Sequence, residues 1–144
     1  MSMLQLRYSV PGDDFTRAGE ASGDVKHKLK KLGYNPSAIR RVSIAMYEGE
    51  INMVIHAGGG EADVEILPDR VSMVLTDHGP GIPDVELAMQ EGWSTAPDNV
   101  RSLGFGAGMG LPNMKKYSDE MTIDSVVGQG TTLKMVVYAQ SEKS

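Results

Sequence analysis

The most telling stretch of this 144-residue chain is Gly104-Phe105-Gly106-Ala107-Gly108-Met109-Gly110-Leu111. Its glycines alternate and lead directly into a predicted helix, which ends near Tyr117 and carries Leu111, Met114 and Tyr117 on one apolar face. Successive exposed amides followed by a helix N-terminus form a favourable site for anions such as phosphates. The stretch lacks the Gly-Lys-Ser/Thr ending of a P-loop, and it follows a predicted loop rather than a strand. A flexible linker is the alternative, but a linker does not usually run into an amphipathic helix.

Outward from this stretch, strand-like and helix-like segments fill most of the chain. Alternating apolar residues predict strands at Leu4–Val10, Ala62–Leu67, Val71–Thr76, Met121–Val127 and Thr131–Tyr138. Helical spacing, with proline or glycine at the ends, predicts helices at Asp14–Leu32, Pro36–Ala57, Pro83–Gln90 and Met109–Tyr117. Residues 92–108 have no clear periodicity and predict a long loop, of a length typical of a functional lid or of disorder. Residues 1–144 are therefore expected to form a single α+β domain, a two-layer sandwich with helices packed on one face of a mixed or antiparallel sheet.

Composition excludes several classes of function. The chain has no cysteine, which excludes a disulfide framework, a thiolate zinc site and thiol catalysis. No apolar run approaches the ~20 residues that span a bilayer, and the N-terminus lacks a signal pattern, so we expect a cytoplasmic protein without membrane contact. The net charge is -5, and nucleic acid is not expected to be a direct partner. Basic residues cluster only locally, at Lys26, Lys28, Lys30, Lys31, Arg40 and Arg41.

The helix around Glu48 carries the first candidate site residues. Glu48, Asn52 and His56 follow at one-turn spacing and form a polar ribbon along one edge of an apolar stripe. That stripe consists of Ile44, Tyr47, Ile51, Val54 and Ile55. A carboxylate in this position can accept a proton from an attacking hydroxyl or water, and an amide oxygen can help to hold Mg²⁺. Taken alone, the Glu/Asn pair also fits a solvated helix face, and His56 fits a histidine packed under the glycines.

Asp77 marks a second candidate patch. It ends the apolar strand Val71–Thr76 and is followed by Gly79 and Gly81. A carboxylate at a strand end can accept a hydrogen bond from an exocyclic amine such as that of adenine. The glycines allow the backbone to approach a ligand closely and to take up positive φ. An ordinary turn is the alternative for this patch alone. Together with the helix and the glycine run, it predicts a pocket for ATP.

The ordered combination of these motifs resembles a known family. Glu48…Asn52, Asp77-x-Gly79-x-Gly81 and Gly104–Leu111, closed by Gly130-Thr131-Thr132, resemble the GHKL (Bergerat-fold) ATP-binding superfamily. That superfamily includes gyrase, histidine kinases, mismatch-repair ATPases and a heat-shock chaperone. Within it, residues 47–57 and 125–132 are similar to the anti-sigma-factor serine kinases of bacterial partner-switching systems. The resemblance spans essentially the whole chain.

Carried onto this sequence, the resemblance implies a role for each motif residue. Glu48 would activate a serine hydroxyl of a protein substrate, and Asn52 would ligate Mg²⁺ bound to ATP. Asp77 would bind the adenine amine with help from water and Thr132, in a pocket shaped by two glycines. The glycines of the adenine pocket would be Gly79 and Gly81, and those that cradle the phosphates in a mobile lid would be Gly104, Gly106, Gly108 and Gly110.

The γ-phosphate end is the least defined part of this pattern. Kinases of this group commonly carry an arginine near the phosphate-binding glycines. The nearest one here is Arg101, several residues before the end of the cluster, and it is the candidate for that contact. Lys115 and Lys116 are alternatives, although a solvated helix face also explains them.

The resemblance implies an ATP-dependent protein serine kinase and regulatory switch that phosphorylates a small STAS-type antagonist protein, with a sigma factor or other regulator as a second partner. Two alternatives stay open. One is a module that binds ATP or ADP and sequesters a partner with little catalysis. The other is a detached histidine-kinase catalytic domain, which is disfavoured because no helix with a phosphoacceptor histidine precedes residue 1 and His27 matches no such box. A homodimer is also implied, because family members often pair through their sheet and the first strand offers an unprotected edge.

Overall fold

The computed structural model describes residues 3–12, 17–82, 84–85, 89 and 110–140. Most of the helix predicted at Pro83–Gln90 and all of the loop predicted at 92–108 lie outside these residues. The same is true of four predicted site residues, namely Arg101, Gly104, Gly106 and Gly108.

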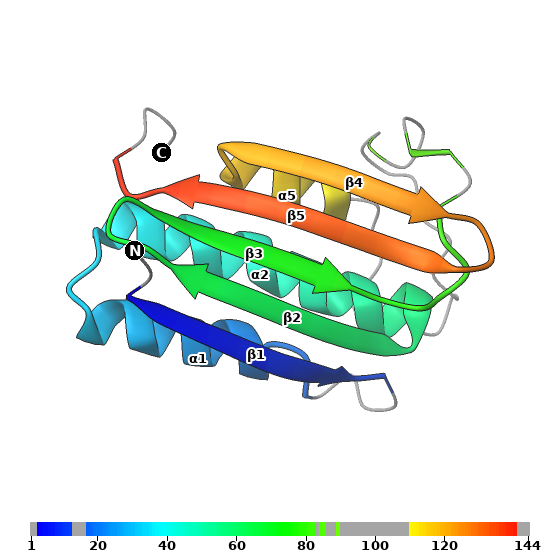
Figure 1. Cartoon of the computed structure of the whole chain (residues 1–144), viewed down its shortest axis with the longest axis horizontal. Helices are drawn as coiled ribbons and strands as arrows, with labels where there is room; N and C mark the ends of the chain where they lie inside the picture. Colours follow the sequence, from blue (N-terminus) through cyan, green and yellow to red (C-terminus); the bar gives the residue numbers. More distant parts are fainter. Residues whose placement is uncertain (1–2, 13–16, 83, 86–88, 90–109, 141–144) are drawn as a thin grey trace.

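Five strands in the described part of the chain form one sheet in the order β1-β2-β3-β5-β4 (Figure 1). Their bounds are Leu4–Pro11 for β1, Gly59–Ile66 for β2, Arg70–Thr76 for β3, Glu120–Val126 for β4 and Gly130–Tyr138 for β5. Each pair of neighbours runs antiparallel, so the sheet is antiparallel rather than mixed. β1 and β4 are its two edges.

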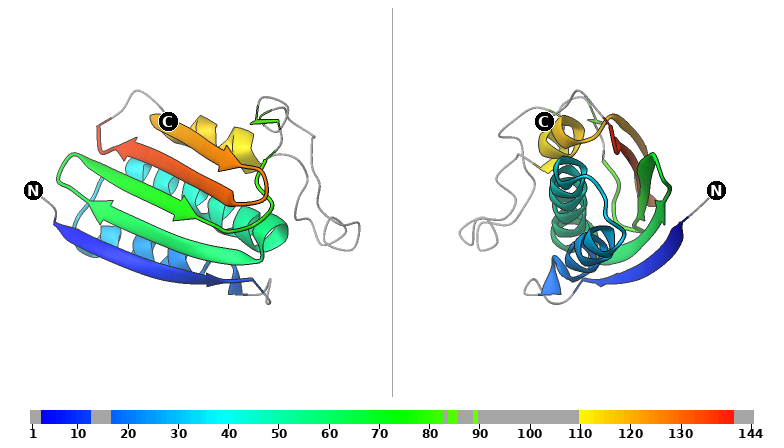
Figure 2. Two further views of the ribbon diagram at one scale, coloured as in Figure 1. Left: turned by 45° about the vertical axis from the view of Figure 1, so that its right-hand side comes forward. Right: turned by 90° about the vertical axis from the view of Figure 1, so that its left-hand side faces the viewer.

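Helices cover one face of this sheet, which confirms the predicted two-layer α+β fold (Figure 2). They are α1 at Glu20–Lys31, α2 at Pro36–Ala57 and α5 at Gly110–Tyr117. α2 begins where predicted because Asn35 caps it: the Asn35 side chain accepts a hydrogen bond from the Ser37 amide at 2.8 Å, and Pro36 starts the first turn. The core lies between the layers, where alternate residues of the strands, such as Met73 and Leu75 of β3, are fully buried.

Two predicted boundaries differ from the structure by more than one residue, for physical reasons. α1 begins at Glu20 rather than Asp14, because Gly19 has a φ of 102° and cannot continue a right-handed helix. β2 begins at Gly59 rather than Ala62, because Gly59 and Gly60 pair with Pro11 and Val10 of β1. The glycines that end α2 therefore also start the next strand.

The predicted apolar stripe of α2 does not coincide with its buried face. Of the five stripe residues only Val54 is buried, whereas Ile44, Tyr47, Ile51 and Ile55 are partly or largely exposed. The buried face includes Val42, Ala45, Met46, Gly49 and Met53. α2 packs against the sheet and lies between α1 and α5, so the surrounding elements rather than the helical period alone decide which residues are covered (Figure 2).

Arg41 links α2 to Asp119, just before β4, and to Tyr138, the last residue of β5. Its side chain is only 1% exposed, and its Nη1 lies 3.0 Å from Asp119 Oδ2 in a buried ion pair. Nη2 donates to the Tyr138 carbonyl at 3.0 Å, and the Tyr138 amide donates to the same Asp119 oxygen at 2.7 Å. Arg41 is therefore structural and is not part of the basic surface that its neighbours in sequence suggested. None of the helices in the described ranges combines the length and apolar character that a membrane span requires.

Candidate functional site

The N-terminus of α5 lies against the polar ribbon of α2. A Cβ built on Gly110, the first residue of α5, would be 3.7 Å from Glu48 Oε2 and 3.9 Å from Asn52 Oδ1. The first turn of α5 thus begins where the carboxylate and the amide of α2 meet. Free amides at a helix N-terminus favour negative charge, so this corner suits an anionic ligand held between α2 and α5.

The surroundings of Glu48 shift the pKa of its carboxyl. It is half-buried, and this burial raises the pKa of its carboxyl because desolvation disfavours the charged form. A side-chain hydrogen bond from Asn113 of α5 opposes the shift and lowers the pKa. A carboxylate with a raised pKa accepts a proton more readily than an ordinary surface glutamate.

Asp77 follows β3 and is held through one of its two carboxylate oxygens. Its Oδ1 accepts hydrogen bonds from the Gly79 amide at 3.0 Å and from the Thr131 amide at 3.1 Å. Its own amide donates to the Thr131 carbonyl at 2.9 Å. The side chain is only 8% exposed, and no residue in the described ranges donates to Oδ2. The carboxylate is therefore oriented by the protein and retains an oxygen that can accept from a ligand amine.

Thr131, not Thr132, is the threonine beside Asp77. The Thr131 side chain is buried and lies 2.9 Å from the Ser125 hydroxyl, which accepts from the Ile82 amide at 2.7 Å. Thr132 is the next residue of β5, pairs with Thr76 and Asp124, and points to the opposite face of the sheet. The expected help from Thr132 is corrected accordingly. Leu133 of β5 faces inward and side chains alternate along a strand, so Thr131 faces inward and Thr132 faces outward. This alternation was the signal available in the sequence.

The two glycines after Asp77 lie where the backbone passes close to α2 and to the β4–β5 hairpin. A Cβ on Gly79 would lie 2.6 Å from the Ala57 Cβ, so only glycine lets this loop pass the end of α2. Gly81 has a φ of 78°, and a Cβ there would lie 2.6 Å from the Val126 carbonyl oxygen. Both positions therefore exclude a side chain, and they fix the loop between α2 and the β4–β5 hairpin.

His56 connects the two ends of the site. It is the last member of the α2 ribbon, and burial lowers the pKa of its imidazole while the nearby Asp77 carboxylate raises it. Ala57, the next residue, is the one that contacts Gly79. One end of the ribbon thus meets α5 at Glu48 and Asn52, and the other meets the Asp77 loop. The sequence patches that lie within the described residues are therefore arranged along α2.

Glu50 has a role that the sequence reading missed. It lies on the side of α2 that faces α1 and is only 1% exposed. Its Oε2 accepts from the amides of Gly19 at 3.0 Å and Ala21 at 3.3 Å, and its Oε1 accepts from the Ser22 amide at 2.6 Å. Gly19 offers no side chain to cap α1, so Glu50 satisfies the free amides of that helix from about thirty residues away. No local motif in the sequence signals this contact.

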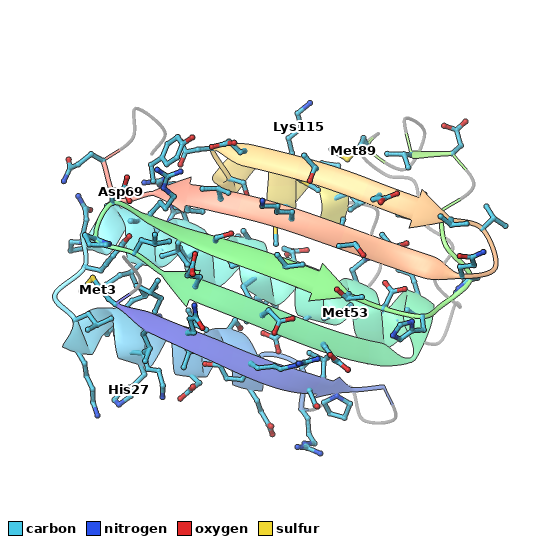
Figure 3. The ribbon with its side chains drawn as sticks, viewed as in Figure 1. Met3, His27, Met53, Asp69, Met89 and Lys115 are labelled. Carbon is cyan, nitrogen blue, oxygen red and sulfur yellow. The ribbon has the colours of Figure 1, made fainter. Side chains whose placement is uncertain are left out.

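The two lysines considered for the γ-phosphate lie on the exposed side of α5. In Figure 3 the Lys115 side chain extends beyond the β4 edge of the sheet, and Lys116 Nζ lies 5.3 Å from the centre of the Tyr117 ring. Both lysines belong to the last turn of α5, whereas Glu48 and Asn52 of α2 lie close to Gly110, the first residue of α5.

The donor set at the Glu48 end fits a hard divalent cation bound mainly through phosphates. Asn52 Oδ1 and Glu48 Oε2 both lie close to Gly110, and both are oxygen ligands of the kind that Mg²⁺ prefers. Among the described residues, no group of three or more His, Cys, Asp or Glu side chains forms a metal cluster. Mg²⁺ usually takes one or two protein oxygens and fills its other positions with phosphate oxygens and water, and Asn52 suits that arrangement.

Comparison with known proteins agrees with this geometry. The family described as "Histidine kinase-, DNA gyrase B-, and HSP90-like ATPase" matches residues 38–141, a range that includes Glu48, Asn52, Asp77 and α5. The serine/threonine-protein kinase RsbT of Bacillus subtilis (strain 168) is 33% identical over 117 residues, which cover 78% of this chain and 82% of that protein. The anti-sigma F factor of Caldanaerobacter subterraneus subsp. tengcongensis is 32% identical over 105 residues, or 69% of this chain and 70% of that protein. The anti-sigma F factor of Bacillus licheniformis is 31% identical over 122 residues, or 81% and 80%. This chain therefore belongs to the family of histidine kinase-, DNA gyrase B- and HSP90-like ATPases.

Proposed function

We propose that the chain is an ATP-dependent protein serine kinase that acts as a regulatory switch. The observation that carries this proposal is the meeting of Glu48 and Asn52 with the first residue of α5, at one end of a helix whose other end meets Asp77. A base, a metal ligand and a helix N-terminus lie at one end, and an oriented carboxylate lies at the other. The arrangement fits a nucleotide with its adenine at Asp77 and its phosphates at α5.

The roles of the residues follow from this orientation. Asp77 Oδ2 accepts a hydrogen bond from the adenine amine, and Gly79 and Gly81 fix the loop that follows Asp77 against α2 and the β4–β5 hairpin. Asn52 holds Mg²⁺, which neutralises charge on the phosphates when it is bound. Glu48 accepts the proton of a serine hydroxyl. At the same time the serine oxygen attacks the γ-phosphorus, and the bond between the γ-phosphorus and the ADP oxygen breaks. We assign the cradling of the phosphates to Gly110 together with the glycines that precede it.

The relatives suggest the kind of partner. One of the similar proteins is named a serine/threonine-protein kinase, and several are named anti-sigma F factors. We propose that the substrate serine belongs to a small STAS-type antagonist protein, and that a sigma factor or similar regulator is a second partner. We also propose a homodimer, for which the unpaired edge of β1 is the candidate surface.

Phosphoryl transfer provides the direct test. The purified protein is mixed with γ-labelled ATP and with antagonist proteins encoded beside its gene, and labelled serine is measured. We expect transfer to the antagonist, and we expect Glu48→Ala to reduce the rate by roughly a hundredfold or more, because removing a general base typically costs 10²–10⁴. ATP affinity should change little in this variant.

The controls separate the kinase from its alternative. Glu65→Ala removes a carboxylate from β2, across the sheet from this site, and should leave transfer unchanged. Tight ATP or ADP binding without any labelled serine would contradict the kinase and would favour a nucleotide-binding module that sequesters its partner. Loss of ATP binding in Glu48→Ala would instead assign Glu48 to the binding of the ligand.

A further inference from the structure

A groove between α1 and α2 lies outside the site described above. It has a volume of about 550 Å³ and is lined by residues from the second half of α1, the loop that follows it and the first half of α2. The lining residues are Lys26, Lys30, Tyr34, Pro36, Ile39, Arg40, Ser43 and Ile44. None of them takes part in the contacts around Glu48, Asn52 or Asp77. The two helices lie side by side on the same face of the sheet, so the groove follows their packed pair (Figure 2).

The floor of the groove is apolar and fixed. Tyr34 and Ile39 are buried, and Ile44 is partly exposed. The Tyr34 hydroxyl donates to the Leu67 carbonyl at 2.9 Å, which anchors the ring, and the Ser43 hydroxyl donates to the Ile39 carbonyl at 2.7 Å. These polar groups are therefore satisfied within the protein, and the surface they leave for a ligand is mainly hydrocarbon.

The rim of the groove is basic in a chain that is acidic overall. Lys26, Lys30 and Arg40 are exposed, and no acidic residue lines the groove. Within the described ranges, no carboxylate lies within ion-pair distance of any of the three, although the neighbouring Lys28 pairs with Asp24 at 3.2 Å. Arg40 instead lies 5.5 Å from the centre of the Tyr117 ring. With a net charge of -5, the protein as a whole repels acidic partners, so this rim is a local exception.

We propose that this groove docks an acidic amphipathic helix of a partner protein. Apolar side chains of that helix would lie on the Tyr34–Ile44 floor, and its carboxylates would face Lys26, Lys30 and Arg40. An apolar centre with a charged rim is the usual anatomy of a protein interface, and laying the apolar face of a helix into a groove is a recurring mode of recognition. The α2 side of the groove runs from Pro36 to Ile44, about 12 Å of helix, which gives room for about two turns of a partner helix.

The groove lies close to the proposed base along α2. Ile44 is one helical turn before Glu48, so a partner helix on this floor ends about 6 Å along α2 from the proposed base. Docking itself does not depend on the proposed kinase activity, because no residue of the groove belongs to the nucleotide site. The two proposals can therefore fail separately.

A peptide binding experiment tests the docking site. The probe is a synthetic fluorescein-labelled peptide of about four helical turns, with leucine at positions i, i+3, i+4 and i+7 and glutamate on the remaining face. Fluorescence anisotropy measures its affinity for the full chain at about 0.15 M salt, where long-range charge effects are screened. We expect Lys30→Glu to weaken binding about tenfold and Ile44→Ser to weaken it severalfold, because each removes one component of the interface.

Lys134→Glu is the matched control. Lys134 is exposed on β5, so this variant has the same change in net charge as Lys30→Glu at a position outside the groove, and it should bind the peptide as the unchanged protein does. ADP binding should be the same in all three variants, which shows that each is folded. Equal losses in Lys30→Glu and Lys134→Glu, or equal affinity for a peptide with lysine in place of glutamate, would overturn the proposal. Displacement of the peptide by millimolar inorganic phosphate at constant ionic strength would also overturn it, because the groove would then be a site for small anions.

Discussion

Two glutamates of α2, Glu48 and Glu50, lie about half a helical turn apart, on opposite sides of the helix. They show how the same side chain takes different roles in different surroundings. Glu50 faces α1, is only 1% exposed and accepts three backbone hydrogen bonds. Glu48 faces α5, is half-buried, and burial raises its pKa with only the Asn113 side chain opposing the shift. The first carboxylate has its hydrogen-bonding capacity used by the protein, whereas the second keeps capacity for a ligand.

The difference gives a criterion for a functional carboxylate. A buried acidic group whose oxygens are all satisfied by backbone amides stabilises the fold and has little left for chemistry. A buried acidic group with an unused oxygen carries a desolvation cost that the contacts within the fold do not offset. Asp77 is intermediate, because Oδ1 accepts two amides and Oδ2 accepts from no residue in the described ranges.

Glu50→Gln should have the largest effect on stability. The side-chain oxygen of glutamine can still accept from an α1 amide, but the NH2 group that replaces the second carboxylate oxygen cannot. At least one charge-assisted hydrogen bond is therefore lost, and the NH2 group faces a backbone donor. We expect the free energy of unfolding to fall by about 2–3 kcal/mol, measured by urea denaturation. Glu20→Gln is the control, since Glu20 is an exposed residue of the same helix terminus, and it should change stability by less than about 0.5 kcal/mol. Equal effects of the two variants would contradict the capping role of Glu50.

The contact made by Glu50 also marks the limit of what the sequence could predict. Periodicity gave the five strands and placed α2 at Pro36–Ala57, because those signals are local. The start of α1 was missed because Glu50, about thirty residues away, supplies its cap. Whether Ile44 or Met46 is buried depends on where α1 and α5 pack, and the sequence of α2 alone does not contain that information.

The candidate site was easier to predict than the packing. Glu48, Asn52 and Asp77 come from motifs that can be recognised by their order along the chain, without knowledge of their contacts. The resemblance implied Thr132, whereas alternation along β5 puts Thr131 on the buried face, so the sequence contained the information that separates the two.

Asp77→Asn should have the next largest effect, and it is seen in ligand binding. The amide oxygen can still accept from Gly79 and Thr131, so the loop should keep its structure, but the negative charge that we propose faces the adenine amine is lost. We expect the affinity for ATP and ADP to fall by about 1–3 kcal/mol, measured by calorimetry. Asp63→Asn changes an exposed carboxylate on β2 and should leave affinity unchanged. Unaltered affinity in Asp77→Asn would remove Asp77 from the site.

A pair of threonine variants extends the comparison from the two sides of a helix to the two faces of a strand. Thr131→Val removes the hydroxyl that lies 2.9 Å from Ser125 in a buried network. We expect it to lower the free energy of unfolding by about 1 kcal/mol in urea. Thr132→Val makes the same change on the other face and should lie within about 0.5 kcal/mol of the unchanged protein. The reverse order would place Thr132, rather than Thr131, in the network beneath Asp77.

The pH dependence of Glu48 is the smallest and most selective effect. Its folded-state pKa is raised above the unfolded value, so the group contributes stability that is fully present below the unfolded pKa and is lost as pH rises through the folded pKa. Glu48→Gln removes this loss because glutamine has no charged form to desolvate. The melting temperature of Glu48→Gln relative to the unchanged protein should therefore be higher at pH 7 than at pH 4. Asn113 and the exposure of half the side chain limit the size of the difference, but its sign follows from burial alone. A relative melting temperature that falls from pH 4 to pH 7 would mean that the charged form of Glu48 is stabilised by the fold, and the distinction between the two sides of α2 would no longer hold.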